Sequence, residues 1–219
     1  MSSKIITIVG MGPGNAMGLA RRFGREGFTV AMIARSDHKL REYQKKLGRN
    51  KIESYYYLAD VSDPQELKGS LSYIHESLGP TEVLVYNPAI ARQGDLLKLS
   101  EETLLEDLHV NAVGALTAVK ATLPVMEESG GGKIFMTGGG YAMHPDPSYG
   151  SLAMGKAALR NLTLSLHAQL KPRNIHVATV TICGMINTDD EKYNPDAIAE
   201  QYWSLYQQQG ESWEKEIVY

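Results

Sequence analysis

The chain has 219 residues, of which 43% are hydrophobic and 21% charged, so one globular domain with a sizeable core is expected. Its formal net charge of −3 provides no basic field for nucleic acid or for an acidic membrane surface. The single cysteine, Cys183, excludes an internal disulfide and a thiolate metal cluster, and no apolar run reaches the roughly 18 residues of a membrane span. The opening MSSK has no apolar leader, so we expect a cytoplasmic protein without a membrane partner or a nucleic-acid partner.

A glycine-rich turn follows the first predicted strand. Residues 5–9 are apolar, residues 10–18 read GMGPGNAMG, and a helical pattern follows from Leu19. In parallel α/β sheets, a strand, a tight glycine turn and a helix N-terminus build a phosphate site, because backbone N–H groups point at the ligand. The Gly-x-Gly-x-x-Gly spacing fails here, but Gly-x-x-x-Gly-x-Gly fits from Gly12 through Ala16 to Gly18, with alanine in the middle. The alternative is a glycine-rich turn that binds no ligand.

Strands and helices alternate along the rest of the chain. Apolar runs predict strands over residues 28–34, 54–59, 82–86, 133–137, 176–182 and, as a short last strand, 216–219. Helices are predicted over residues 37–47, 64–78, 100–128, 147–170 and 195–209. No linker interrupts this order. We therefore predict one dinucleotide-binding domain over residues 1–219, an α/β fold with a doubly wound parallel (Rossmann) sheet of six or seven strands and helices on both faces.

Glycines and polar residues gather where the predicted strands end. They are the turn 12–18, Arg35, Asp60, Asn87, the glycines 138–140 and Gly184. In a doubly wound sheet, ligands bind at the carboxyl ends of the strands, where the strand order reverses. The shared location of these residues therefore predicts a ligand site there.

In this order the motifs resemble those of the short-chain dehydrogenase/reductase family over nearly the whole chain. The glycine turn is similar to the family's cofactor loop, and Asp60-Val61 is similar to its adenine-contacting Asp-Val. Asn87-Pro88-Ala89 stands where the family has Asn-Ala-Gly, and Asn111 takes the place of its helix asparagine. Cys183-Gly184 replaces the usual Pro-Gly, and Thr188 matches the threonine four residues after that glycine.

The sequence departs from the family pattern at two of the positions that the family uses for catalysis. The resemblance implies Tyr-x-x-x-Lys on one helical face, where the lysine holds the nicotinamide ribose and favours ionisation of the tyrosine. Lys156 is present, but the residue four before it is Leu152. The family's serine lies thirteen residues before its tyrosine, and Gly139 stands in that place.

Three residues could replace the missing acid: Tyr149, Tyr141 and His144. Tyr149 is seven residues before Lys156, which is two helical turns on nearly the same face if the helix begins at Pro147. The alternative for all three is a pocket-lining aromatic or a loop residue, because geometry must precede any assignment of an acid. The proton would then come through a water chain that reaches Asn111 and Lys156.

The residues after the second strand favour NADP(H). Ala34 provides no carboxylate for the ribose hydroxyls of NAD, so Arg35 and Ser36 are free to bind a 2′-phosphate. A solvated arginine is the alternative.

Lys156 lies in an apolar helix and needs a partner such as a ribose. The alternative is that its ammonium group reaches water while its methylene chain covers apolar surface. Asn111 is either catalytic or a hydrogen-bonded structural amide.

We therefore predict an NADP(H)-dependent oxidoreductase that acts on a small-molecule carbonyl or C=C substrate, with Asn111, Lys156 and Tyr149 as the catalytic residues. The alternative is a catalytically silent NADP(H)-binding sensor or partner protein on the same fold. The expected cofactor contacts are Gly12, Asn15, Ala16, Met17, Gly18, Arg35, Ser36, Asp60, Val61, Asn87, Lys156, Gly184, Ile186 and Thr188. We expect no metal site. The helices over 102–128 and 147–170 are apolar almost all round, which predicts a homodimer or a homotetramer.

Overall fold

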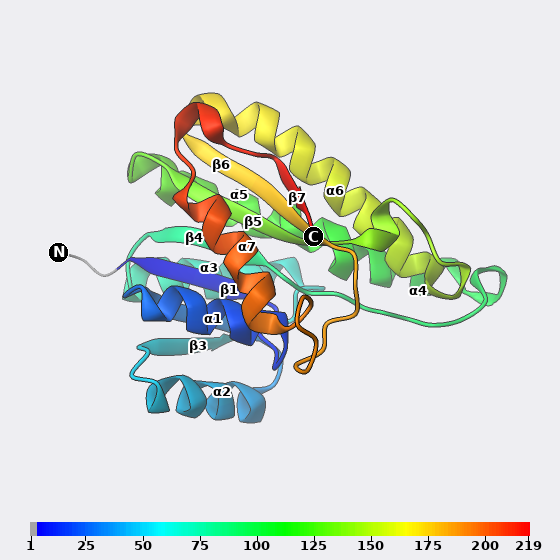
Figure 1. The fold of residues 1–219 in the computed structure, drawn as a ribbon, viewed down its shortest axis with the longest axis horizontal. Coiled ribbons are helices and arrows are strands. Elements are labelled where there is room, and N and C mark those ends of the chain that lie inside the picture. The colour runs from blue at the N-terminus through cyan, green and yellow to red at the C-terminus, as the bar shows by residue number, and fades with distance from the viewer. Residues whose placement is uncertain (1–3) are drawn as a thin grey trace.

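A sheet of seven parallel strands, in the order β3-β2-β1-β4-β5-β6-β7, forms the centre of the computed structural model, which describes residues 4–219 (Figure 1). The strands are β1 (Ile5–Val9), β2 (Thr29–Ala34), β3 (Ser54–Leu58), β4 (Thr81–Tyr86), β5 (Gly132–Gly139), β6 (Ile175–Ile182) and β7 (Glu216–Val218). The predicted doubly wound sheet is confirmed, and the predicted last strand pairs in parallel with β6. Residues 1–3, part of the stretch in which no leader is expected, lie outside the described residues.

Helices cover both faces of the sheet. α1 (Asn15–Arg25), α2 (Asp37–Arg49) and α7 (Pro195–Gln207) pack into one apolar core. α3 (Pro64–Ser77), α5 (Gly114–Glu128) and α6 (Gly150–Leu170) pack into a second. Successive strand residues such as Ile5 and Ile6 belong to different cores, because neighbouring side chains point to opposite faces. α1 and α7 lie side by side on the front face in Figure 1.

Short polar side chains cap several helices at their N-termini. The Asp63 carboxylate accepts hydrogen bonds from the amides of Gln65 and Glu66, and Pro64 takes the first position of α3. Ser100 caps α4 (Glu101–Leu108), which continues through a π-helical segment (His109–Val113) into α5. The predicted long helix over 100–128 therefore exists, with one irregular turn.

The prediction that Pro147 begins the helix over 147–170 is wrong by one turn. Pro147–Tyr149 forms a 3-10 turn whose cap, Asp146, accepts a hydrogen bond from the Ser148 amide. α6 begins at Gly150, since Tyr149 has φ −125° and ψ 37°, outside the helical region. Tyr149 consequently precedes α6, and its two-turn relation to Lys156 along a helix does not hold.

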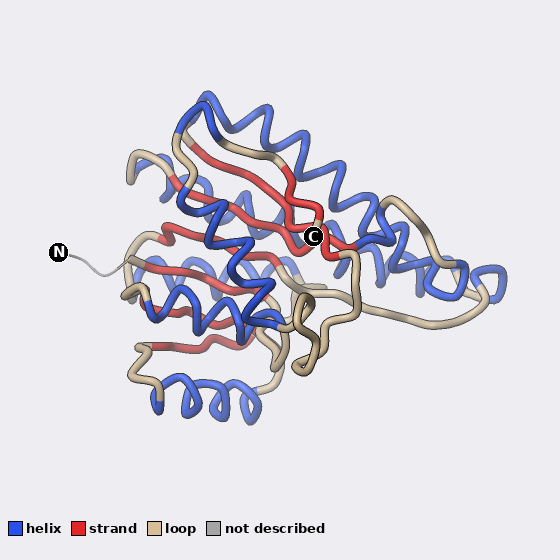
Figure 2. Tube along the Cα trace, viewed as in Figure 1, coloured by secondary structure: helices blue, strands red, loops and turns tan. Residues whose placement is uncertain are grey.

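The carboxyl ends of the strands share one side of the molecule. The strands run from left to right in Figure 1, and the loops that follow them gather on the right in Figure 2. The strand order reverses between β1 and β4. Among residues 4–219, no helix is both long and apolar enough to span a bilayer.

Candidate active site

A cavity of about 380 Å³ lies at the carboxyl ends of β1, β2, β3 and β4. Its lining includes six residues that follow these strands: Gly10, Arg35, Asp60, Val61, Asn87 and Ile90. This is the point at which the strand order reverses, so the structure brings together the predicted contacts at 35, 60, 61 and 87.

The N-terminus of α1 borders this region and is available to an anion. α2, α3, α4 and α7 are capped by side chains, whereas in the described chain Gly14 gives α1 no side-chain cap. Uncapped N–H groups at a helix N-terminus favour a phosphate. No heavy atom outside the adjoining residues lies within 4 Å of the position that a Cβ of Gly12 would occupy, so the turn has room for a ligand. The residues present therefore fit a dinucleotide.

The remaining residues of the glycine turn face inward. Ala16 and Met17 are buried in the core under α1 and α7. A Cβ at Gly18 would lie 2.2 Å from the main-chain oxygen of Pro195. The close approach of α1 and α7 therefore explains glycine at 18. Only the backbone near Ala16 and Met17 is left for a ligand, because their side chains belong to the core.

Arg35 and Asp60 both line the cavity and form an ion pair there. The Arg35 Nη1 lies 3.5 Å from the Asp60 Oδ2, and the Arg35 side chain is 76% exposed. Burial opposes ionisation of Asp60, but hydrogen bonds from Ser62 and the nearby Arg35 keep its pKa below the usual value. Ser36 caps α2 by accepting a hydrogen bond from the Lys39 amide. Val61 is buried beside them.

Beneath the glycine turn lies a buried polar network that sequence reasoning missed. The Asn15 Nδ2 donates to the Asn87 Oδ1 at 2.9 Å, and the Asn87 Nδ2 donates to the Gly10 carbonyl at 3.0 Å. The Thr137 and Tyr202 hydroxyls lie 2.8 Å apart, and Thr137 also donates to Asn87. Burial raises the pKa of Tyr202 to about 12, so it stays a neutral phenol. The one sequence signal for this network was Tyr202, a tyrosine on the apolar side of α7.

Lys156 lies at the carboxyl end of β5. Its Nζ donates a hydrogen bond of 2.7 Å to the Thr137 carbonyl, and the residue is 6% exposed. Burial lowers the pKa of its ammonium to about 8. A Cβ at Gly139 would lie 3.6 Å from the Lys156 Cγ, so the place of the absent serine adjoins this lysine. Leu152, in the place of the absent tyrosine, is almost buried on the same helix.

Asn111 lies in the π-helical segment and holds the loop after β4. Its Oδ1 accepts a hydrogen bond from the Ile90 amide at 2.7 Å, and its Nδ2 donates to the Ile90 carbonyl at 3.2 Å. Both polar atoms of its side chain are therefore bound to the main chain, as a structural amide requires.

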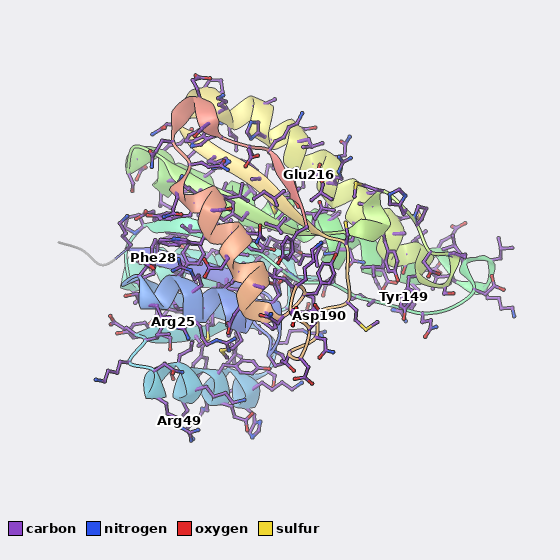
Figure 3. All side chains as sticks on the ribbon, viewed as in Figure 1. Arg25, Phe28, Arg49, Tyr149, Asp190 and Glu216 are labelled. Carbon is purple, nitrogen blue, oxygen red and sulfur yellow. The ribbon has the colours of Figure 1, made fainter. Side chains whose placement is uncertain are left out.

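The three candidate acids lie between β5 and α6. Tyr149 and Tyr141 are half-buried and stack with ring centroids 5.6 Å apart and an interplanar angle of 18°. Tyr149 lies on the right-hand side in Figure 3, toward the carboxyl ends of the strands. His144 is exposed and its amide donates to the Gly140 carbonyl.

The loop after β6 carries the last predicted cofactor contacts. A Cβ at Gly184 would lie 2.2 Å from the Tyr193 ring, so the loop folds back on itself there. Ile186 and Thr188 are exposed, and the Thr188 hydroxyl lies 3.5 Å from the Asp189 carboxylate. Among residues 4–219, no three His, Cys, Asp or Glu side chains form a group that could hold a metal ion.

Comparison with known proteins agrees with this geometry. The family model for short chain dehydrogenases matches residues 4–198. Dehydrogenase/reductase SDR family member 4 of Sus scrofa is 28% identical over 193 residues, covering 86% of this chain and 68% of that protein. Oxidoreductase UcpA of Salmonella typhimurium is 29% identical over 184 residues, covering 82% and 68%.

Solved structures of the same kind superpose over nearly the full chain. A short-chain dehydrogenase from Rhodopseudomonas palustris has a TM-score of 0.87 at 25% identity, with 98% of this chain and 96% of that chain covered. A metagenomic short-chain oxidoreductase in complex with NADP has a TM-score of 0.90 at 21% identity, covering 99% and 96%, and shares the fold. The chain belongs to the short-chain dehydrogenase family, whose members use nicotinamide cofactors, and is an oxidoreductase of that type.

Proposed function

We propose that the protein is an NADP(H)-dependent oxidoreductase that transfers a hydride to or from a carbonyl or C=C substrate. The placement of Lys156 carries this proposal. Burying an ammonium costs free energy, and the Nζ of Lys156 donates to the main-chain carbonyl of Thr137 rather than to a carboxylate. The Thr137 hydroxyl donates to Asn87, which lines the cavity, so a lysine kept buried here at such a cost fits a role in holding a cofactor ribose.

The choice of NADP(H) rests on the end of β2. Ala34 supplies no carboxylate to a ribose, and Arg35 exposes its guanidinium next to the cavity. An exposed guanidinium binds a 2′-phosphate by charge-assisted hydrogen bonds. The fold neighbour in complex with NADP supports the same choice.

In this proposal the bound nicotinamide supplies or accepts the hydride, and the protein provides orientation and a proton. The glycine turn and the N-terminus of α1 would hold the diphosphate, Arg35 would hold the 2′-phosphate, and Lys156 would hold the ribose. The Tyr149 hydroxyl donates the proton that the substrate oxygen needs on reduction. Leu152 and Gly139 supply neither a hydroxyl nor a charge, so they shape the site without taking part in proton transfer.

A second candidate is a sensor that binds NADP(H) without turnover. Leu152 and Gly139 favour it, because a protein that transfers no proton has no need of a hydroxyl at either position.

Two measurements on the purified protein separate these candidates. NADPH binding is followed by fluorescence titration, and NADPH oxidation is followed by absorbance across a panel of aldehydes, ketones and enones. Binding with turnover on at least one substrate class supports the oxidoreductase. Tight binding with no oxidation across the panel would leave the sensor.

A further inference from the structure

A carboxylate outside the predicted site is completely buried. The side chain of Asp107 on α4 has an exposed fraction of 0%. Its two oxygens accept hydrogen bonds of 3.0 Å each from the Nε and Nη2 of Arg92. The Ser151 hydroxyl, in the first turn of α6, donates a third at 2.7 Å. We call these three residues the Arg92–Asp107–Ser151 cluster.

Burying the Asp107 carboxylate in this cluster costs desolvation free energy. Desolvation opposes the charge of Asp107, but the hydrogen bonds from Arg92 and Ser151 and the positive charge of Arg92 keep its pKa below the usual value. Apolar side chains of similar volume generally stabilise a fold as well as a buried ion pair does. What the cluster adds is a fixed geometry between three chain segments.

One of those segments, the loop after β4, contacts the residues on either side of Tyr149. Arg92 belongs to the loop after β4, and the amide of Gly94 in the same loop donates to the Ser148 carbonyl at 2.9 Å. A Cβ at Gly150 would lie 3.0 Å from the Leu96 Cδ1, so this loop also packs on the residue after Tyr149. The loop after β4 therefore contacts both sequence neighbours of Tyr149.

Tyr149 needs such support because no regular element holds it. It is the last residue of a 3-10 turn, in front of α6, and its ring stacks on Tyr141. A proton donor on an irregular segment must be fixed by its surroundings, since displacement by about 1 Å can cost a hundredfold in rate.

We propose that Asp107 and Arg92 are positioning residues that hold the 148–151 segment so that the Tyr149 hydroxyl faces the substrate. This inference rests on the proposed role of Tyr149 as the proton donor. Neither Asp107 nor Arg92 contacts the reacting atoms in this account, and both act through the turn before α6.

The test is Asp107→Asn, which keeps the volume of the side chain but cannot accept both hydrogen bonds from Arg92. The matched control is Glu216→Gln in β7, which removes the partner of Arg160 at the middle of α6. There Arg160 donates to both oxygens of Glu216 at 2.8 and 2.7 Å, and the Thr181 hydroxyl donates at 2.6 Å. The two substitutions therefore remove chemically similar ion pairs.

We expect Asp107→Asn to lower kcat about 10- to 100-fold, with the Kd for NADPH changed less than about twofold. Hydrogen exchange should rise in peptides covering residues 92–98 and 146–152 and stay unchanged in the glycine turn. Glu216→Gln should change neither kcat nor exchange in these peptides.

A double variant shows whether Asp107 acts through Tyr149. If it does, Asp107→Asn combined with Tyr149→Phe has the same kcat as Tyr149→Phe alone. A further loss equal to that of the single Asp107→Asn variant would overturn the inference, as would an Asp107→Asn enzyme that resembles Glu216→Gln. Absence of turnover in the wild type would instead contradict the proposed function. In that case unchanged exchange in residues 146–152 of Asp107→Asn would overturn the inference separately.

Discussion

The Nζ of Lys156 donates a hydrogen bond of 2.7 Å to the main-chain carbonyl of Thr137. The Thr137 hydroxyl in turn joins the network under the glycine turn, through Asn87 and Tyr202. One residue at the end of β5 therefore contacts both the buried amine and the polar network under the glycine turn. This hydrogen bond fixes the ammonium of Lys156 at the end of β5, and it does not involve the side chain at position 152.

Cofactor selectivity should depend on Arg35. We expect wild type to bind NADPH more tightly than NADH, and Arg35→Ala to remove most of that preference. A charge-assisted contact with phosphate contributes roughly 1.5–3 kcal/mol, which corresponds to about ten- to a hundredfold in Kd. Fluorescence titration with both cofactors measures the ratio. Arg49→Ala, at the opposite end of α2 (Figure 3), is the control and should keep the preference. Equal constants for the two cofactors in wild type would contradict the assignment.

A hydroxyl at position 152 should restore the family's spacing to Lys156. Leu152→Tyr places a phenol one helical turn before the lysine, and the lysine charge favours its ionisation. We expect increased reduction of generic carbonyl compounds by this variant, measured as NADPH oxidation. Leu152→Phe provides the ring without the hydroxyl and should bring no increase. If both variants behave alike, the lysine does not activate an acid at this position.

Large apolar side chains remain exposed on the helices beside the site. Leu105 of α4 is 66% exposed and Met154 of α6 is 43% exposed. Two copies that pair through these helices would cover such residues, so we predict a homodimer or a homotetramer. Light scattering at micromolar concentration gives the mass. Leu105→Glu and Met154→Glu should lower it, whereas Leu58→Glu on the edge strand β3 should not. A monomeric mass for wild type would refute this.

Stability in mild acid should depend on His176. Burial lowers its pKa from 6.5 to about 4, and its ring stacks on Trp213. The neutral form is favoured in the fold, so the unfolded chain takes up the proton first as the pH falls below 6.5. Stability is therefore lost between pH 6.5 and 4, by about 3 kcal/mol from this group.

The comparison is with His176→Gln, which cannot titrate but can still donate to the Glu214 carbonyl that the His176 Nε2 contacts. Urea unfolding at pH 7 and pH 4.5 should show a smaller loss for the variant. Parallel losses would mean that His176 keeps an ordinary pKa in the fold.

Local patterns were sufficient for the fold. Apolar runs predicted strands such as β2 and β6, because this signal lies within the element that it defines. The start of α6 was misplaced because Pro147 fits a 3-10 turn as well as a helix.

The long-range polar contacts of the site could not be predicted. Tyr202 reaches the glycine turn from 187 residues away along the chain. Asp107 is the seventh residue of a helix rich in carboxylates, in which a sequence pattern indicates solvent exposure rather than a buried ion pair. Such pairings depend on how the helices pack against one another, and the hydrophobic periodicity of the sequence does not indicate that packing.

The measurement that tests the account most directly is the kcat of Tyr149→Phe for NADPH-dependent reduction, compared with wild type on the same substrate. The substitution keeps the ring that stacks on Tyr141 and removes only the hydroxyl. Loss of a general acid predicts a fall in kcat of roughly 10²–10⁴, with the Kd for NADPH unchanged. Tyr73→Phe, an exposed tyrosine on α3, is the control. An unchanged kcat in Tyr149→Phe would contradict the assignment of Tyr149 as the proton donor.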